Sequence, residues 1–282
     1  MNVEDLTKID VGFYENMTND VYHKSSGVSK SVLDMSVVDL YKPEWSRVCP
    51  IDSDKIKTFN FGDAMHAICL EPHRLKADFT VMPDFNLRTN SGKQEKKEFE
   101  EYHKDFKILT DKEHKKLCLM YESVMSHPKA RALIEADGIA EGSYFWKDDE
   151  TGLLCKCRPD KNLSNGLLVD IKTTPDIKTF NQSVDDYRYY VQDPWYCDGV
   201  KRFECEQRME FLVIQKNIEL GRYPVEVISL PSEVIEYGRD VYRDNLNQYA
   251  EFLEQKKEPK TKELEMSFRF YQKSNEYYGD AI

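Results

Sequence analysis

The sequence of 282 residues lacks the features that place a chain in a membrane or a secretory pathway. No apolar run approaches the ~18 residues that a membrane-spanning helix needs. The first ten residues are polar and acidic, with neither the apolar segment of a secretory signal nor an Arg-rich amphipathic presequence. We therefore expect a cytoplasmic protein with no membrane partner.

Regularly spaced cysteines are also absent. The seven cysteines are odd in number and include no Cys-x-x-Cys pair, which indicates reduced thiols rather than a disulfide framework. Cys155 and Cys157 share one face of a predicted strand, and Cys197 and Cys205 follow, but this arrangement is not that of a metal cluster. We expect no iron–sulfur cluster.

An excess of positive charge is missing as well. The chain has 40 Lys and Arg against 51 Asp and Glu, a net charge of −11, so any nucleic-acid ligand must be held by positive groups concentrated locally. What the chain does have is 40% hydrophobic residues, with 17 Tyr and 14 Phe. This composition predicts a folded protein with a sizeable core, built as one large domain.

Composition and periodicity divide the chain into three parts. Residues 1–25 are predicted to be an irregular lead-in, and residues 256–282 a charged and aromatic tail. Between them, residues 26–255 form one α/β domain, mainly helical over 26–135 and carrying the sheet over 136–255. Helices are predicted from Ser29 to Pro43, from Phe61 to Leu70, from Asp111 to Ile134 with an interruption near Pro128, and from Pro231 to Leu253.

Two short apolar runs separated by a polar turn predict a β-hairpin that carries charged groups. The first run is Cys155–Asp160 and the second is Leu167–Lys172, within an antiparallel meander that begins with a strand at Glu141–Trp146. Asp170 and Lys172 alternate with Ile171, so they share a face about 6.6 Å apart along the strand. Asp160, at the end of the neighbouring strand, can join them.

Two carboxylates and a lysine at one strand edge suit a metal-dependent phosphoryl chemistry. Carboxylates that repel each other tolerate closeness when a divalent cation lies between them, and Mg²⁺ favours one or two carboxylates with water and phosphate oxygens. A lysine beside them can orient or deprotonate an attacking water. The alternative is an ordinary Asp-x-Lys pair on the surface of an edge strand.

Two further stretches have open interpretations. His66 is the one titratable side chain inside the apolar helix that starts near Phe61, so it is either a hydrogen-bonded core residue or a member of the site. Residues 86–106 are predicted to be a mobile basic loop leading into a helix, either a solvated linker or a clamp on DNA phosphates. The clamp would use Arg88, Lys93, Lys96 and Lys97.

A helical pattern follows Pro175 and contains Gln192 and Tyr196, four residues apart on one face. Pro194 lies between them. Because proline removes a helical hydrogen bond, we expect a kink here, with Asp193 capping a second helical piece.

These motifs, in their order along the chain, resemble the RecE-type exonucleases (exodeoxyribonuclease VIII) of the PD-(D/E)XK superfamily. The resemblance covers roughly residues 20–250. The motifs that carry it are Gly62-x-x-x-His66, Glu141, Pro159-Asp160, Asp170-Ile-Lys172 and Tyr190-Val-Gln192-Asp-x-x-Tyr196. Pro194 departs from the pattern, because a helix former is expected there.

The resemblance implies a PD-(D/E)XK core, in which helices flank a central mixed sheet, with an N-terminal helical elaboration. It implies a catalytic set drawn from these motifs and a metal held by four groups. The catalytic residues are His66, Glu141, Asp160, Asp170, Lys172, Gln192 and Tyr196, and the metal ligands are His66, Asp160, Asp170 and the backbone carbonyl of Ile171.

The same resemblance implies an activity and partners. The expected reaction is Mg²⁺-dependent digestion of one strand of duplex DNA from its ends, 5′→3′, with Mn²⁺ able to substitute. The expected assembly is a ring-shaped homo-oligomer, and the expected partner is a RecT-like single-strand annealing protein that coats the 3′ overhang. Two alternatives remain: another PD-(D/E)XK nuclease, such as an endonuclease or a Cas4-like enzyme, and a DNA-end binding module that does not cleave.

Overall fold

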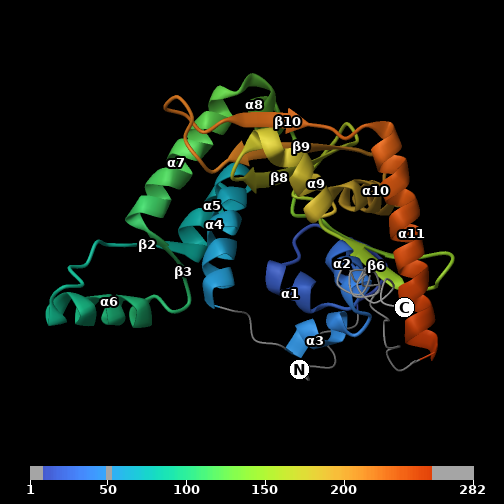
Figure 1. Ribbon diagram of the computed structural model, residues 1–282, viewed down its shortest axis with the longest axis horizontal. Helices are drawn as coiled ribbons and strands as arrows, with labels where there is room; N and C mark the ends of the chain where they lie inside the picture. Colours follow the sequence, from blue (N-terminus) through green and yellow to red (C-terminus); the bar gives the residue numbers. More distant parts are fainter. Residues whose placement is uncertain (1–8, 49–52, 256–282) are drawn as a thin grey trace, which may run out of the picture.

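The structure is a computed structural model that describes residues 9–48 and 53–255. Its centre is a mixed five-stranded sheet in the order β10-β9-β8-β7-β4, in which β8 and β9 are parallel and the other pairs antiparallel. Figure 1 shows β10, β9 and β8 side by side. These strands are β4 (Gly138–Ala140), β7 (Lys161–Leu163), β8 (Leu167–Thr174), β9 (Arg208–Gln215) and β10 (Val225–Ile228). The prediction of a central mixed sheet flanked by helices is confirmed.

Two smaller sheets and eleven α-helices complete the described residues. The smaller sheets are the antiparallel β1 (Gly12–Tyr14), β5 (Ser143–Lys147) and β6 (Leu154–Cys157), and the parallel pair β2 (Phe79–Met82) and β3 (Lys107–Thr110). The helices are α1 (Asn19–Lys24), α2 (Lys30–Val38), α3 (Lys42–Val48), α4 (Ser53–Leu70), α5 (Pro72–Asp78), α6 (Asn90–Tyr102), α7 (Asp111–Ser126), α8 (Pro128–Glu135), α9 (Phe180–Asp186), α10 (Tyr189–Val200) and α11 (Ser232–Gln255), with a 3₁₀ turn at Ile177–Thr179. None of the helices within the described ranges is both long and apolar enough to cross a membrane.

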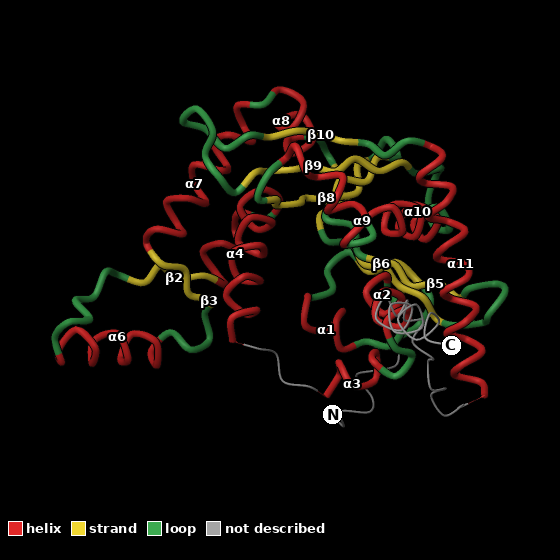
Figure 2. Tube along the Cα trace, in the orientation of Figure 1, coloured by secondary structure: helices red, strands yellow, loops and turns green. Residues whose placement is uncertain are grey.

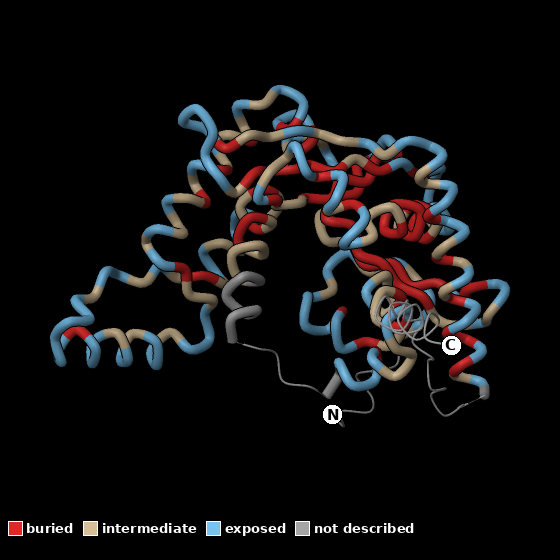
Figure 3. Tube along the Cα trace, viewed as in Figure 1, coloured by how far each residue is buried: buried red, intermediate tan, exposed pale blue. Residues whose placement is uncertain are grey.

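Alternation along β8 and β9 sends side chains into two separate cores. Val169 and Ile171 of β8 pack with α4, α7 and α8, whereas Leu168 lies in the core formed by α2, α9, α10 and α11. Because both faces of these parallel strands are covered, they are apolar on both sides, and Figure 3 shows the buried residues concentrated there. Asp170 and Lys172 share the face of Leu168, so they point toward α10.

The predicted meander is wrong after Cys157. β6 pairs with β5 in the three-stranded sheet, and only Lys161–Leu163 continues as a partner of β8. The other edge of β6 is occupied by Val28, whose backbone bonds to Leu154 and Lys156. Since Pro159 has no N–H for a ladder, the chain leaves one sheet there and enters the other. The carboxylate of Asp160 therefore lies in a gap between two sheets rather than in the middle of a hairpin.

The predicted lead-in is also more ordered than expected. β1 pairs with β5, and α1 is held by two buried cations of β6 and its extension. Lys156 donates to the carbonyls of Tyr22 and Ser25, and Arg158 donates to the carbonyl of Met17 and to the hydroxyl of Ser143. These long-range contacts were not visible in the local composition of the segment.

The predicted mobile loop at 86–106 is mostly helix. The hydroxyl of Thr89 accepts the N–H of Gly92 and caps α6. The ring of Phe99 meets that of Phe85 at a tilt, which gives the segment a small apolar contact of its own. Figure 2 shows that loops join α6 to β2 and β3, so the helix lies at the tip of an arm at one side of the molecule. The predicted tail, residues 256–282, lies outside the described residues.

The prediction of a second helical piece that starts at Pro194 is wrong, because the helix boundary lies earlier, at Arg188. Arg188 adopts a left-handed conformation (φ 51°, ψ 47°) between α9 and α10, and α10 then runs through Pro194 without interruption. Proline deprives the Tyr190 carbonyl of its helical donor. Gly238 of α11 packs there so closely that a Cβ would lie 1.7 Å from that oxygen.

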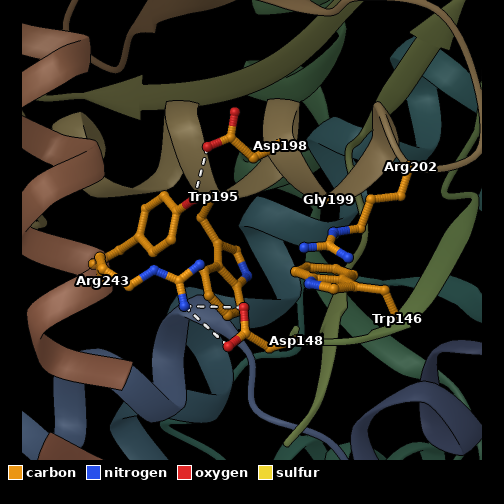
Figure 4. A pocket seen from close by; sticks show the side chains of 8 residues that line it. Trp146, Asp148, Trp195, Asp198, Gly199, Arg202 and Arg243 are labelled. Atoms are coloured by element: carbon orange, nitrogen blue, oxygen red, sulfur yellow. Dashed lines mark hydrogen bonds and ion pairs between the residues drawn. The ribbon is translucent and has the colours of Figure 1, made fainter. Parts of the chain in front are cut away.

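A buried joint ties α11 to the turn between β5 and β6. Figure 4 shows Arg243 reaching the carboxylate of Asp148, with N–O distances of 3.0 and 2.9 Å, beside Trp146 and Trp195. The cavity among these residues is about 20 Å³, room for a single water. None of the predicted site residues lines it, so the chemistry lies elsewhere.

Candidate functional site

The candidate site begins where β7 stops pairing with β8. The β7 ladder ends at the pair Lys161 and Val169, so beyond it β8 has β9 on one side and an open edge on the other. At this edge the N–H of Ile171 donates to Asp160 Oδ2 at 2.6 Å. The carbonyl of Ile171 points to the same side of the strand as its N–H. The predicted metal-binding carbonyl is thus at the open edge, beside Asp160.

Asp170 is held from two directions. It is 2% exposed, Lys172 Nζ lies 2.5 Å from its Oδ2, and the side-chain amide of Gln192 donates to its Oδ1. A carboxylate bonded to two donors keeps one orientation. Gln192 comes from α10 because that helix covers the face of β8 on which Asp170 lies.

His66 and Glu141 complete a cluster around Asp160. His66 Nδ1 lies 3.5 Å from Asp160 Oδ2 and 3.8 Å from Glu141 Oε1, and these three side chains offer ligand atoms within 4.8 Å of one another. Glu141 precedes β5 rather than lying in it, with φ at +53°, and its N–H donates to the Asp160 carbonyl at 3.0 Å. A left-handed glutamate is strained, and such strain is typical of functional positions.

Burial and mutual charge set the protonation of the cluster. Burial, together with the negative charge of Asp170, raises the pKa of Asp160 to about 7. Burial alone would lower the pKa of His66, but the carboxylates of Asp160 and Glu141 outweigh it and raise that pKa to about 9. Burial likewise opposes the charge of Lys172, and Asp170 and Asp160 raise its pKa above the ordinary value.

The donor set fits a divalent cation. Two carboxylates and one imidazole offer ligand atoms within 4.8 Å of one another. Burial and the negative charge of Asp170 raise the pKa of Asp160, and a bound cation would offset both effects. Oxygen ligands suit Mg²⁺ and Mn²⁺, and the imidazole adds preference for a transition metal such as Mn²⁺. His66, Glu141 and Asp160 form the compact triad, with Asp170 and the Ile171 carbonyl on the strand beside it.

Tyr196 lies one turn beyond Gln192 on the same face of α10. Burial is the main reason that its pKa is raised well above the ordinary value, with further contributions from Tyr22 and from the charges of Asp170 and Asp160. The structure therefore places Tyr196 on the α10 face that carries Gln192, the residue that bonds to Asp170. The catalytic roles of these residues stay predictions.

The four predicted DNA-binding residues lie away from this cluster, on the α6 arm. Arg88 is exposed ahead of the helix, Lys93 and Lys97 are exposed on it, and Lys96 is paired with Glu100 at 3.5 Å. The structure does not bring them together with the carboxylates.

Tyr189 is a site neighbour that the sequence reasoning missed. Lys172 Nζ lies 4.7 Å from the centre of its ring. The helical spacing in the sequence could have identified it, because Tyr189 is three residues before Gln192 and so shares its face of the helix.

Comparison with known proteins agrees with this geometry. The sequence matches a PDDEXK-like domain of unknown function (DUF3799) over residues 40–267. No functionally curated protein matches. A solved structure from Eubacterium rectale, whose exonuclease name is provisional, is 12% identical, covers 88% of this chain and 91% of its own, and superposes with a TM-score of 0.59. A phage-related exonuclease from Haemophilus somnus is 11% identical, covers 60% of this chain and 85% of its own, and has a TM-score of 0.30, too weak to bear on the fold.

The family match and the fold place the chain in the PD-(D/E)XK nuclease superfamily. Within it, the chain belongs to the PDDEXK-like DUF3799 family.

Proposed function

We propose that the protein is a divalent-metal-dependent exodeoxyribonuclease that degrades one strand of linear duplex DNA from its ends. The observation that carries the proposal is the convergence of Asp160, Asp170 and Lys172 at the open edge of β8. A module that only binds DNA gains nothing from buried carboxylates, because they repel phosphates.

A divalent ion bound by His66, Glu141, Asp160 and Asp170 would polarise the scissile phosphoryl group and lower the pKa of the attacking water. Mg²⁺ is the expected ion, with Mn²⁺ as a substitute.

The side chains around this position have separate tasks. Gln192 fixes the orientation of Asp170 through its amide. The raised pKa of Lys172 keeps it an ammonium at neutral pH, so it orients the attacking water and offsets negative charge that develops on the phosphate. The Lys172 ammonium lies over the Tyr189 ring, 4.7 Å from its centre, and this cation–π contact limits its movement.

The resemblance to RecE-type exonucleases supports the finer features of the proposal. These are the 5′→3′ direction, the 3′ overhangs made for recombination, a ring-shaped homo-oligomer around the DNA, and a RecT-like annealing partner.

Linear duplexes labelled at either the 5′ or the 3′ end test the activity directly. With Mg²⁺ or Mn²⁺, we expect early release of the 5′ label as mononucleotide and late release of the 3′ label. Ca²⁺ should support binding but poor cleavage, because its looser shell does not hold water and phosphate in the same geometry. Cutting of covalently closed circular DNA would show an endonuclease instead, and intact linear and circular DNA with both metals would leave only a binding module.

A pair of variants separates chemistry from stability. Lys172→Met should lower the cleavage rate by about 10²- to 10⁴-fold. It should also lower Tm, because Asp170 is left buried without its cation. Adding Asp170→Asn removes that buried charge, so the double variant should recover Tm and remain inactive. If Lys172→Met cleaved DNA at the wild-type rate, the assignment of the active site to β8 would be wrong.

A further inference from the structure

Tyr187 stands out as an exposed aromatic side chain held in a fixed position beside the site. It is 61% exposed, yet its ring stacks on Tyr189 with centroids 5.7 Å apart and an angle of 26°. Tyr189 in turn stacks on Phe211 of β9 at 5.7 Å and 28°. This column of contacting rings runs from Phe211 in the core to Tyr187 at the surface, where most of the Tyr187 side chain is exposed.

The backbone under Tyr187 is anchored by partly buried polar side chains of two other helices, α2 and α11. Lys30 of α2 donates to the Tyr187 carbonyl and pairs with Asp34 at 2.6 Å. Arg188 pairs with the same Asp34 at 2.9 Å and donates to Asn245 of α11. A strained left-handed Arg188 and a network of this kind are more than an exposed tyrosine needs for packing. They fix the ring before any ligand arrives, which lowers the entropy lost on binding.

The three stacked rings lie next to Lys172 of the candidate site. The Lys172 ammonium lies 4.7 Å from the Tyr189 centroid, so the Tyr187 ring is one aromatic ring away from it. A DNA strand whose scissile phosphate lies at Lys172 has its neighbouring base within reach of this surface. Near a duplex end that base can leave its pair at little expense of stacking energy.

We propose that Tyr187 is a base-stacking residue that receives the nucleobase next to the scissile phosphate. The ligand is a nucleobase of any identity, because every base offers a π-face and the open ring offers no hydrogen-bond code. This inference rests on the proposed function, since it supposes that a DNA strand passes Lys172.

Tyr237 of α11 provides a matched control. It is also 61% exposed, and it stacks on Tyr190 with centroids 5.7 Å apart and an angle of 28°. Tyr190 is rotated roughly 100° around α10 from Tyr189, so this second stack lies on a different face of α10 from the ring that contacts Lys172. Two tyrosines of equal exposure and stacking therefore differ in their position relative to the site.

The test uses duplex DNA with 2-aminopurine near the 5′ end, bound by the full chain in Ca²⁺, so that binding is read without turnover. Wild type and Tyr237→Leu should quench the fluorescence by stacking, Tyr187→Trp should keep the quench, and Tyr187→Leu should lose it. The affinity of Tyr187→Leu should fall about 5- to 150-fold, the range that one stacked base accounts for.

A cycle with an abasic nucleotide at the same position checks that ring and base act together. Wild type should lose as much affinity on the abasic duplex as Tyr187→Leu loses on the intact one, and Tyr187→Leu should lose nothing further. The wild-type comparison needs no variant. Equal affinity of wild type for the abasic and intact duplexes would therefore contradict the proposal even if Tyr187→Leu fails to fold.

The outcomes separate the two proposals. The stacking proposal is wrong if Tyr187→Leu and Tyr237→Leu show equal quenching and equal affinity. It is also wrong if wild type binds the abasic and intact duplexes equally well. Neither result contradicts the nuclease proposal. Tyr187-dependent quenching with no cleavage in Mg²⁺ or Mn²⁺ keeps the stacking residue and overturns the nuclease. A wild type that does not bind DNA overturns both.

Discussion

His66 lies between two carboxylates, and this position controls when it can bind a metal ion. A histidine ligand must be neutral, whereas Asp160 and Glu141 raise the pKa of His66 to about 9 against the opposing effect of burial. The same crowding, led by burial, raises the pKa of Asp160 to about 7. Metal binding at neutral pH must therefore displace protons from the cluster.

We predict that Mn²⁺ affinity rises with pH between about 7 and 9, approaching tenfold per pH unit for the one proton on His66. Calorimetry at pH 8 in buffers of different ionisation enthalpy should show release of close to one proton per ion. His66→Gln should bind more weakly and lose this proton release. A wild type that releases no proton at pH 8 would contradict a role of His66 as ligand.

At the scale of elements, the turn between β5 and β6 depends on a buried ion pair. Burial opposes the ionisation of Asp148, but Arg243 of α11 and the backbone and hydroxyl of Thr151 outweigh it and lower its pKa below the ordinary value of 3.8. The contribution of Asp148 to stability is thus present above pH 3.8 and lost as the pH falls through its lower folded-state pKa.

We predict that Asp148→Ala lowers the free energy of unfolding by roughly 1–3 kcal/mol, because Arg243 and the Thr151 N–H lose a buried acceptor while Arg243 keeps Glu150, at 3.6 Å. The neighbouring Asp149 is 83% exposed in its side chain and pairs with Arg202 at 3.0 Å. Asp149→Ala should therefore change stability by at most about 1 kcal/mol. Urea unfolding of both variants at pH 7 measures the difference. If the two variants lost equal free energy of unfolding, the stabilising role of the Asp148–Arg243 pair would be contradicted.

The close packing of α11 on α10 also depends on the absence of a side chain at Gly238. A Cβ on Gly238 would overlap the Tyr190 carbonyl, so we predict that Gly238→Ala destabilises the protein by about 1–3 kcal/mol. Gly62 in α4 has nothing within 4 Å of its would-be Cβ. Gly62→Ala should instead stabilise by up to about 1 kcal/mol, since alanine favours a helix. Thermal unfolding should show Tm shifts of opposite sign; shifts of the same sign would contradict the close packing.

At the scale of the whole molecule, a chain of net charge −11 has to attract a polyanion. The α6 arm is the predicted place, but the helix carries the four glutamates 95, 98, 100 and 101 beside its three lysines. Lys96 is already paired with Glu100. The unpaired candidates for phosphate contact are thus fewer than the sequence suggested.

We predict that Arg88→Ala with Lys93→Ala lowers the slope of log affinity against log salt by about 0.9 for each phosphate contact removed. The variant should also leave DNA sooner during digestion. Lys129→Ala with Arg131→Ala on α8, which removes the same charge, should leave the slope unchanged. If the two double variants have the same salt slope and leave DNA equally fast, α6 is a solvated arm that does not contact DNA. The nuclease proposal is not affected by that result.

Local physical rules determined much of this structure from sequence alone. Ser29 accepts the N–H of Val32 and starts α2, and Pro128 begins α8 after the interruption predicted there, because caps and prolines act within a few residues. The two-residue period of a strand likewise put Asp170 and Lys172 on one face, and their ion pair follows from it.

Only the tertiary structure decided which edges meet. Val28 covers β6, so β6 joins the second sheet and Asp160 is left in the gap where Glu141 and His66 converge. The break at Arg188 is set by Asp34 and Asn245 on other helices, while Pro194 is tolerated inside α10 against Gly238. Strand pairing and helix packing depend on partners that are distant in the sequence, and no local pattern specifies those partners.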